Sequence, residues 1–79
     1  MTNEEAFELI KKALDNTTPG LSAKIENSTD LVNDGLIDSL DSMNFLFELE
    51  TLHGDRLSAI DETFDDFRVS RFVEILTTS

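Results

Sequence analysis

The chain has 79 residues, enough for one small domain, and it has no cysteine for a disulfide or a thiolate metal ligand. Seventeen acidic residues against six basic ones give a formal net charge of −11. Such a surface repels phosphate backbones and anionic membranes, so we expect no nucleic-acid partner. No stretch approaches the roughly 20 apolar residues that span a bilayer, and the first residues do not resemble a signal peptide. We therefore expect a single cytoplasmic domain over residues 1–79, without membrane insertion.

The negative charge is concentrated in the middle of the chain. Residues 30–66 contain eleven acidic residues and one basic residue, Arg56. A partner protein with a basic patch would be attracted and steered by this region. The simpler interpretation, that acidity only keeps a small protein in solution, accounts for the same observation.

A first amphipathic helix is predicted from Thr2 to about Asp15. Thr2 and Glu5 have the spacing of a capping box. Apolar residues then recur at helical spacing on one face: Phe7, Ile10 and Leu14, with Ala6 and Ala13 beside them. The Pro-Gly pair at the end of residues 15–20 marks a turn.

Residues 21–34 show poor periodicity, which predicts a long loop with at most one helical turn. Loops of this length in small domains tend to be functional. The loop ends at the sequence NDG, where Gly35 predicts a tight turn.

A second helix is predicted from about Ser39 to Leu52 or His53, with Gly54 ending it. Its apolar residues fall into two groups: Phe45, Leu46, Leu49 and Leu52 on one side, and Leu40, Met43 and Phe47 on the other. One group is enough to dock the helix, so the second is expected to be partly exposed. The alternative, in which Met43 and Phe47 belong to the core, remains open at this point.

A short helical or irregular connector is predicted next, with four side chains pointing inward: Leu57, Ile60, Phe64 and Phe67. A last helix follows from about Ser70, with apolar candidates Phe72, Val73, Ile75 and Leu76. The chain therefore predicts an all-α fold, a small bundle of three principal helices plus one short helix.

Ser39 raises the question of hydrolytic chemistry. A catalytic triad requires a base beside the nucleophile. The one histidine of the chain, His53, lies fourteen residues further along the same predicted helix, about four turns away. We therefore expect no enzymatic activity and interpret His53 as a helix-end residue.

A calcium loop is the more serious alternative. With Gly35 at position six of an EF-hand register, aspartates fall at positions one, five, nine and twelve: Asp30, Asp34, Asp38 and Asp41. However, Val32 at position three offers no side-chain oxygen, and Asp41 is shorter than the usual bidentate glutamate. A small acidic regulatory or calcium-binding module that uses residues 30–41 thus stays as the alternative function.

A third interpretation treats Ser39 as a site of covalent modification. A hydroxyl in the first turn of a helix is exposed, and a phosphodiester attached there is favoured by the helix dipole and free amides. A serine after an aspartate is also a common arrangement at a plain helix start, because either side chain can cap the orphan amides.

The motif Asp38-Ser39-Leu40, within DGLIDSLDSMNFLFELE, resembles the modification site of acyl carrier proteins. Length, acidity and helix order agree with that family over nearly the whole chain. The resemblance implies that a phosphopantetheinyl transferase joins 4′-phosphopantetheine from coenzyme A to Ser39, framed by Asp38 and Leu40. The terminal thiol of that arm then carries an acyl or aminoacyl group as a thioester, which explains how a chain without cysteine could use thiol chemistry.

The same resemblance implies a set of partner-binding residues on the second helix: Asp41, Met43, Phe47 and Glu48. It also implies a non-catalytic monomer whose partners are the transferase, a loading ligase, and acceptor or modifying enzymes with basic patches. Leu36 and Ile37 lengthen the segment after Gly35, as in D-alanyl carriers. We therefore expect a specialised carrier and not the housekeeping carrier of fatty-acid synthesis.

Overall fold

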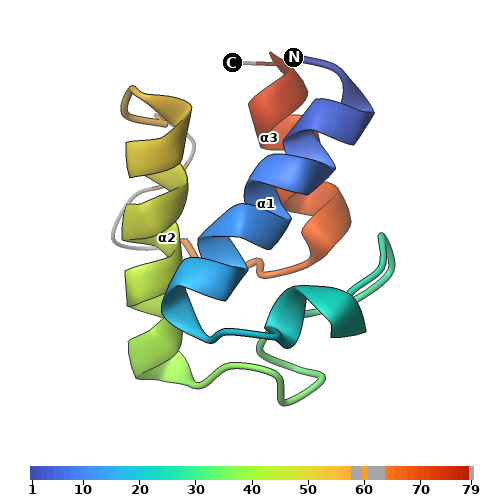
Figure 1. Ribbon diagram of the computed structural model, residues 1–79, viewed down its shortest axis with the longest axis vertical. Helices are drawn as coiled ribbons and strands as arrows, with labels where there is room; N and C mark the ends of the chain where they lie inside the picture. The colour runs from blue at the N-terminus through green and yellow to red at the C-terminus, as the bar shows by residue number, and fades with distance from the viewer. Residues whose placement is uncertain (58–59, 61–63, 79) are drawn as a thin grey trace.

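The computed structural model describes residues 1–57, 60 and 64–78, which form three α-helices and one short 3₁₀ helix (Figure 1). In chain order these are α1 (Asn3–Thr17), η1 (Leu21–Lys24), α2 (Ser39–His53) and α3 (Val69–Thr78). The predicted all-α bundle of three principal helices plus one short helix is confirmed. The short helix is the single turn expected in the loop after α1. A helical form of the connector before α3 falls largely on residues 58–59 and 61–63, outside the described residues.

The helix ends lie within two residues of their predicted positions because local capping chemistry fixes them. At the start of α1, the Thr2 hydroxyl accepts the Glu5 N–H at 3.1 Å, and the Glu5 carboxylate accepts the Thr2 N–H at 2.9 Å. This capping box is as predicted. At the end of α2, Gly54 adopts φ +87° and donates its N–H to the Glu50 carbonyl at 3.0 Å. A residue without a side chain adopts this left-handed conformation at little cost.

Helix α1 is the common support of the bundle, since it contacts both α2 and α3 (Figure 1). Its inward face is the predicted apolar face: Ala6, Ile10, Ala13 and Leu14 are buried, with Phe7 partly buried beside them. The inward residues of α3 are Val69, Phe72, Val73, Ile75 and Leu76. Leu57, Ile60 and Phe67 of the connector are buried and Phe64 packs against the core, as predicted.

Helix α2 buries only one of its two apolar groups. Phe45 and Leu49 are fully buried, whereas Met43 and Phe47 are exposed. Phe45 meets Phe72 of α3 edge-on, with ring centroids 5.1 Å apart. The alternation along α2 therefore places two phenylalanines, two positions apart, in opposite environments.

This contrast gives a matched test of the packing. Replacing Phe45 with alanine leaves a cavity in a close-packed interior and is expected to lower the free energy of unfolding by about 3–5 kcal/mol. Phe47→Ala removes a ring that faces solvent, and its effect is expected to stay within about 0.5 kcal/mol. Urea denaturation of both variants, followed by circular dichroism, measures the difference. Equal destabilisation by the two substitutions would contradict the observed orientation of α2.

Candidate functional site

The candidate site is built at the start of α2, where Ser39 is the first helical residue. Asp38 is the N-cap: its backbone is extended, and its carboxylate accepts the Asp41 N–H at 2.8 Å. Of the two possible caps, Asp38 and Ser39, it is therefore Asp38 that caps α2. The Ser39 side chain is exposed, and its hydroxyl makes no hydrogen bond to any described residue. Because Asp38 caps the helix, the Ser39 hydroxyl is available for chemistry.

A neighbouring serine, Ser42, is in the opposite situation. Its hydroxyl donates to the Ser39 carbonyl at 2.7 Å, and the residue is only 7% exposed. Two serines in one turn of helix are therefore distinguished by burial, which the sequence motif alone does not establish.

His53 lies at the other end of α2, about 20 Å along the helix axis from Ser39. Its Nδ1 lies 3.4 Å from the Asp55 carbonyl oxygen, which is consistent with a helix-end role and not with activation of Ser39.

The loop that leads to Ser39 is held in place through Leu31. This side chain is fully buried, and its carbonyl accepts the N–H groups of Leu36 at 3.1 Å and Ile37 at 3.0 Å. Gly35, at φ +77°, makes the turn that these two bonds require. Ile37 is buried directly before the cap. The chain therefore enters α2 in one fixed direction, with Ser39 outward.

A short antiparallel bridge joins this loop to the segment before α3. Leu31 donates its N–H to the Phe67 carbonyl, and Val69 donates its N–H to the Thr29 carbonyl, each at 2.9 Å. Asp66 and Arg68 flank Phe67, and the Arg68 guanidinium binds the Asp66 carboxylate through two hydrogen bonds of 2.8 and 2.6 Å. These bonds lower the pKa of Asp66 below its ordinary value. No periodicity in the sequence signals this bridge.

The Asp66–Arg68 pair predicts a specific pH dependence. The folded-state pKa of Asp66 is lowered, so the stabilisation is present above the unfolded value of about 3.9 and is lost as pH falls through the folded value. The stability difference between the wild type and Asp66→Asn is therefore expected to be constant above about pH 5 and to shrink below about pH 4. Urea denaturation across this range measures it. A difference that grows on acidification would contradict the pairing.

Beyond Ser39, α2 exposes a row of apolar side chains. Leu40 and Met43 are each 68% exposed and Phe47 is 71% exposed. We call these three residues the apolar stripe. The alternative that Met43 and Phe47 belong to the core is therefore wrong. Asn44 lies on the same face, because positions 40, 43, 44 and 47 recur at helical spacing, and this residue is also exposed. That spacing could have identified Asn44 from the sequence, where it was missed.

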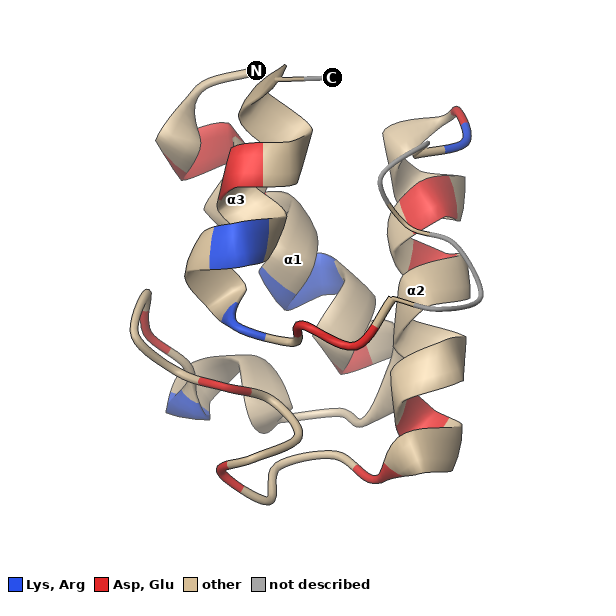
Figure 2. Ribbon diagram, turned by 180° about the vertical axis from the view of Figure 1, so that it is seen from behind, with Lys and Arg blue, Asp and Glu red and all other residues tan. Residues whose placement is uncertain are grey.

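Acidic side chains border the apolar stripe. In Figure 2 the Lys, Arg, Asp and Glu positions along α2 are all acidic, whereas α1, α3 and the loops carry both acidic and basic positions. Asp41 is half-buried, and its carboxylate makes no hydrogen bond or ion pair with the described residues. Glu48 is half-buried as well, and its carboxylate accepts a hydrogen bond from the Asn16 side-chain amide at 3.3 Å. Asp41 is therefore the freer of the two predicted partner-binding acids.

The four aspartates of the calcium register do not form a ligand set. The Asp30 carboxylate accepts the N–H groups of Val32 and Asn33, and Asp34 accepts the Asp30 N–H at 3.0 Å. Within the described residues, no three His, Cys, Asp or Glu side chains converge to hold a metal ion. These carboxylates instead satisfy the backbone of their own loop, so the arrangement does not favour the calcium alternative.

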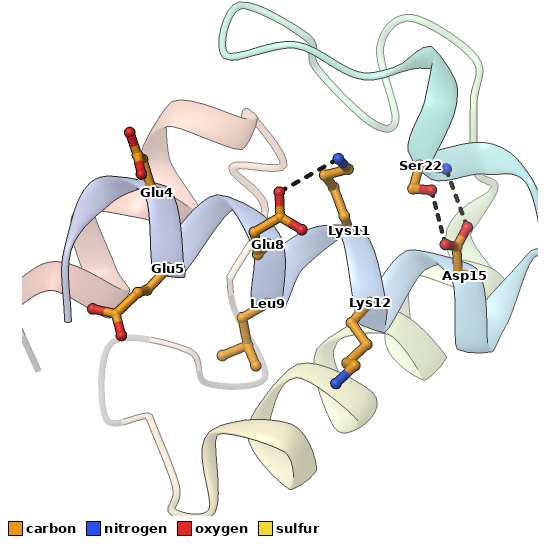
Figure 3. A pocket seen from close by; sticks show the side chains of 8 residues that line it. All are labelled: Glu4, Glu5, Glu8, Leu9, Lys11, Lys12, Asp15 and Ser22. Carbon is orange, nitrogen blue, oxygen red and sulfur yellow. Dashed lines mark hydrogen bonds and ion pairs between the residues drawn. The ribbon is translucent and has the colours of Figure 1, made fainter.

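A shallow hollow on α1 offers no competing site (Figure 3). Its side chains project to different sides of the helix: Leu9 and Lys12 point away from Glu8 and Lys11, which pair with each other at 3.5 Å. Asp15 is held by the Ser22 hydroxyl at 2.8 Å, and this bond lowers the pKa of Asp15. Two pairs of these polar groups thus engage each other, and the lining side chains do not converge on a common point.

Comparisons with protein-family models, with curated protein sequences and with solved structures found no match to this chain. Among the described residues, no helix combines the length and the apolar character needed to cross a membrane.

Proposed function

We propose that this chain is a carrier protein that holds acyl or aminoacyl groups on a 4′-phosphopantetheine arm attached to Ser39 and delivers them to partner enzymes. The observation that carries the proposal is the position of Ser39. It is an exposed, unengaged hydroxyl at the start of a fifteen-residue helix, directly followed by an exposed apolar stripe. A structural helix start requires a cap, which Asp38 supplies, but it does not require the apolar stripe.

The residues around Ser39 fit a tethered phosphate. The backbone N–H groups of Ser39 and Leu40 have no hydrogen-bond partner among the described residues, and they belong to the positive end of the α2 dipole. The negative charges of Asp38 and Asp41 oppose a free anion at this place, although the Asp38 carboxylate is turned onto the Asp41 N–H. Because the phosphate of the arm is covalently attached to the Ser39 oxygen, the site does not need to bind a free phosphate.

When attached, the group supplies a flexible arm that ends in a thiol and carries its cargo as a thioester, chemistry that a chain without cysteine does not have. The residues of the chain present the attachment point and the docking surface. Tethering raises the effective concentration of the cargo at a partner that is docked on α2. We expect no reaction to be catalysed by the chain itself.

The apolar stripe and its acidic border indicate the kind of partner. Apolar contact at the centre with charged residues around it is the usual anatomy of a protein interface. The acidic border selects enzymes with basic patches: a phosphopantetheinyl transferase, a loading ligase, and acceptor or modifying enzymes. Two copies docked through their stripes would bring their own Asp41 and Glu48 residues together, so like-charge repulsion favours a monomer in the cytoplasm.

The attachment site is tested by incubating the protein with coenzyme A, magnesium and a broad-specificity phosphopantetheinyl transferase, followed by intact mass measurement. The wild type and Ser42→Ala are expected to gain one phosphopantetheine group, because Ser42 is buried and engaged. Ser39→Ala is expected to gain none. A wild type that stays unmodified, or a Ser39→Ala variant that is modified equally, would remove the basis of the proposal.

Electrostatic steering is tested at Asp41. The variant Asp41→Asn is expected to raise the KM of the transferase for the carrier by about 3- to 10-fold and to weaken its salt dependence, because a border charge mainly affects encounter. Glu4→Gln, an exposed change of the same kind on α1, is the matched control and is expected to leave KM unchanged. Equal effects of the two variants would assign the attraction to overall charge and not to α2.

A further inference from the structure

Aromatic ring contacts connect α2 with α3. In the described residues, no Cα atom of α2 lies within 8 Å of a Cα atom of α3, although both helices pack on α1. Ring contacts join four side chains of α2, α3 and the segment before α3, which we call the phenylalanine cluster: Phe45, Phe64, Phe67 and Phe72. Phe72 is the hub, with ring centroids 5.1 Å from Phe45, 5.4 Å from Phe64 and 5.7 Å from Phe67.

The inward side of α2 near Ser39 is closed in the same way. Ile37 and Ser42 are nearly buried, and Phe45 and Leu49 are fully buried in the next two turns. Two hollows on the described surface lie elsewhere, along α1 and at the end of α2 beside Phe47 and Arg56. Neither is lined by Phe45, Phe64, Phe67 or Phe72. A chain tethered at Ser39 therefore meets packed side chains on its inward path.

We infer that the group carried on Ser39 stays outside the helical bundle, and that the cargo is a short or polar acyl group, such as an aminoacyl group, and not a long alkyl chain. This inference rests on the proposed function. Insertion of an alkyl chain between α2 and α3 must displace rings that are already in contact, and overpacking of a well-packed core destabilises it. Each methylene left in water is also unfavourable, and an alkyl chain laid on the apolar stripe would cover the surface proposed for partners. Long alkyl cargo therefore has no suitable place on this carrier. A short or charged cargo needs no such place.

The test attaches an alkyl chain at Ser39 by chemistry alone. Because the chain has no cysteine, Ser39→Cys introduces a single thiol. Its thiolate attacks octyl methanethiosulfonate to form a mixed disulfide and release methanesulfinate, and the methyl reagent gives the matched short chain. If the interior is closed, the melting temperatures of the octyl and methyl forms are expected to differ by less than about 1 °C. Burial of the octyl chain would instead raise the melting temperature by about 5 °C or more, because several methylenes leave water.

Methyl NMR of the same two forms provides the second readout. The resonances of Leu49 and Leu76, buried in the core, are expected to be the same in the octyl and methyl forms. Shifts of these resonances together with a higher melting temperature would overturn the inference. Ser70→Cys, at an exposed position on α3, carries the same two labels and reports any non-specific effect of the alkyl chain.

The result of this labelling test is independent of the result of the transferase test of the proposed function. Labelling of the thiol needs no enzyme, so a closed interior can be established even if the transferase does not modify Ser39. Conversely, modification of Ser39 together with burial of the octyl chain would keep the carrier and overturn the inference about its cargo.

Discussion

Three backbone hydrogen bonds at Leu31 hold the site in place. The N–H of Leu31 is bound by the Phe67 carbonyl, and its own carbonyl binds Leu36 and Ile37. The loop between η1 and α2 has no regular secondary structure, so these bonds, together with the burial of Ile37 and the Asp38 cap, fix the direction in which it enters the helix. The burial of Leu31 adds an apolar anchor at the same point. The outward position of Ser39 therefore depends on a contact between two segments that are far apart in the chain.

Helix α2 carries apolar side chains on two sides, one buried and one exposed. Phe45 and Leu49 attach it to the core, while Leu40, Met43 and Phe47 face outward. A surface helix that needs only to be stable has one apolar face and one polar face. An exposed apolar stripe within an acidic border is unfavourable in water for an isolated protein and becomes favourable when a partner covers it. The two-sided apolar pattern of α2 thus connects the packing of the bundle with the proposed delivery of cargo.

Much of this arrangement could be predicted from the sequence because it rests on local chemistry. The Thr2–Glu5 capping box and the left-handed Gly54 require only residues close in the chain, and they located the helix ends. The two apolar groups of α2 could be recognised from helical spacing, although the spacing could not decide which group is buried. That choice depends on packing against α1 and α3, and the structure resolves it in favour of Phe45 and Leu49.

Other features could not be predicted because they are long-range. The bridge between Thr29–Leu31 and Phe67–Val69 joins two irregular segments, and neither has a periodic pattern that would reveal it. The contact of Asn16 with Glu48 joins two helices through polar groups at positions that otherwise look like ordinary surface. The motif alone also left open whether Asp38 or Ser39 caps α2. The three-dimensional arrangement shows Asp38 in that role, which frees the hydroxyl of Ser39.

We propose that the exposed hydroxyl of Ser39 carries a phosphopantetheine arm. The most direct measurement is fragmentation mass spectrometry of the protein purified from the cells in which it is naturally made. We expect a phosphopantetheine adduct located on Ser39 and an unmodified Ser42. Protein that carries no adduct at Ser39, or an adduct at another residue, would contradict the proposed attachment site.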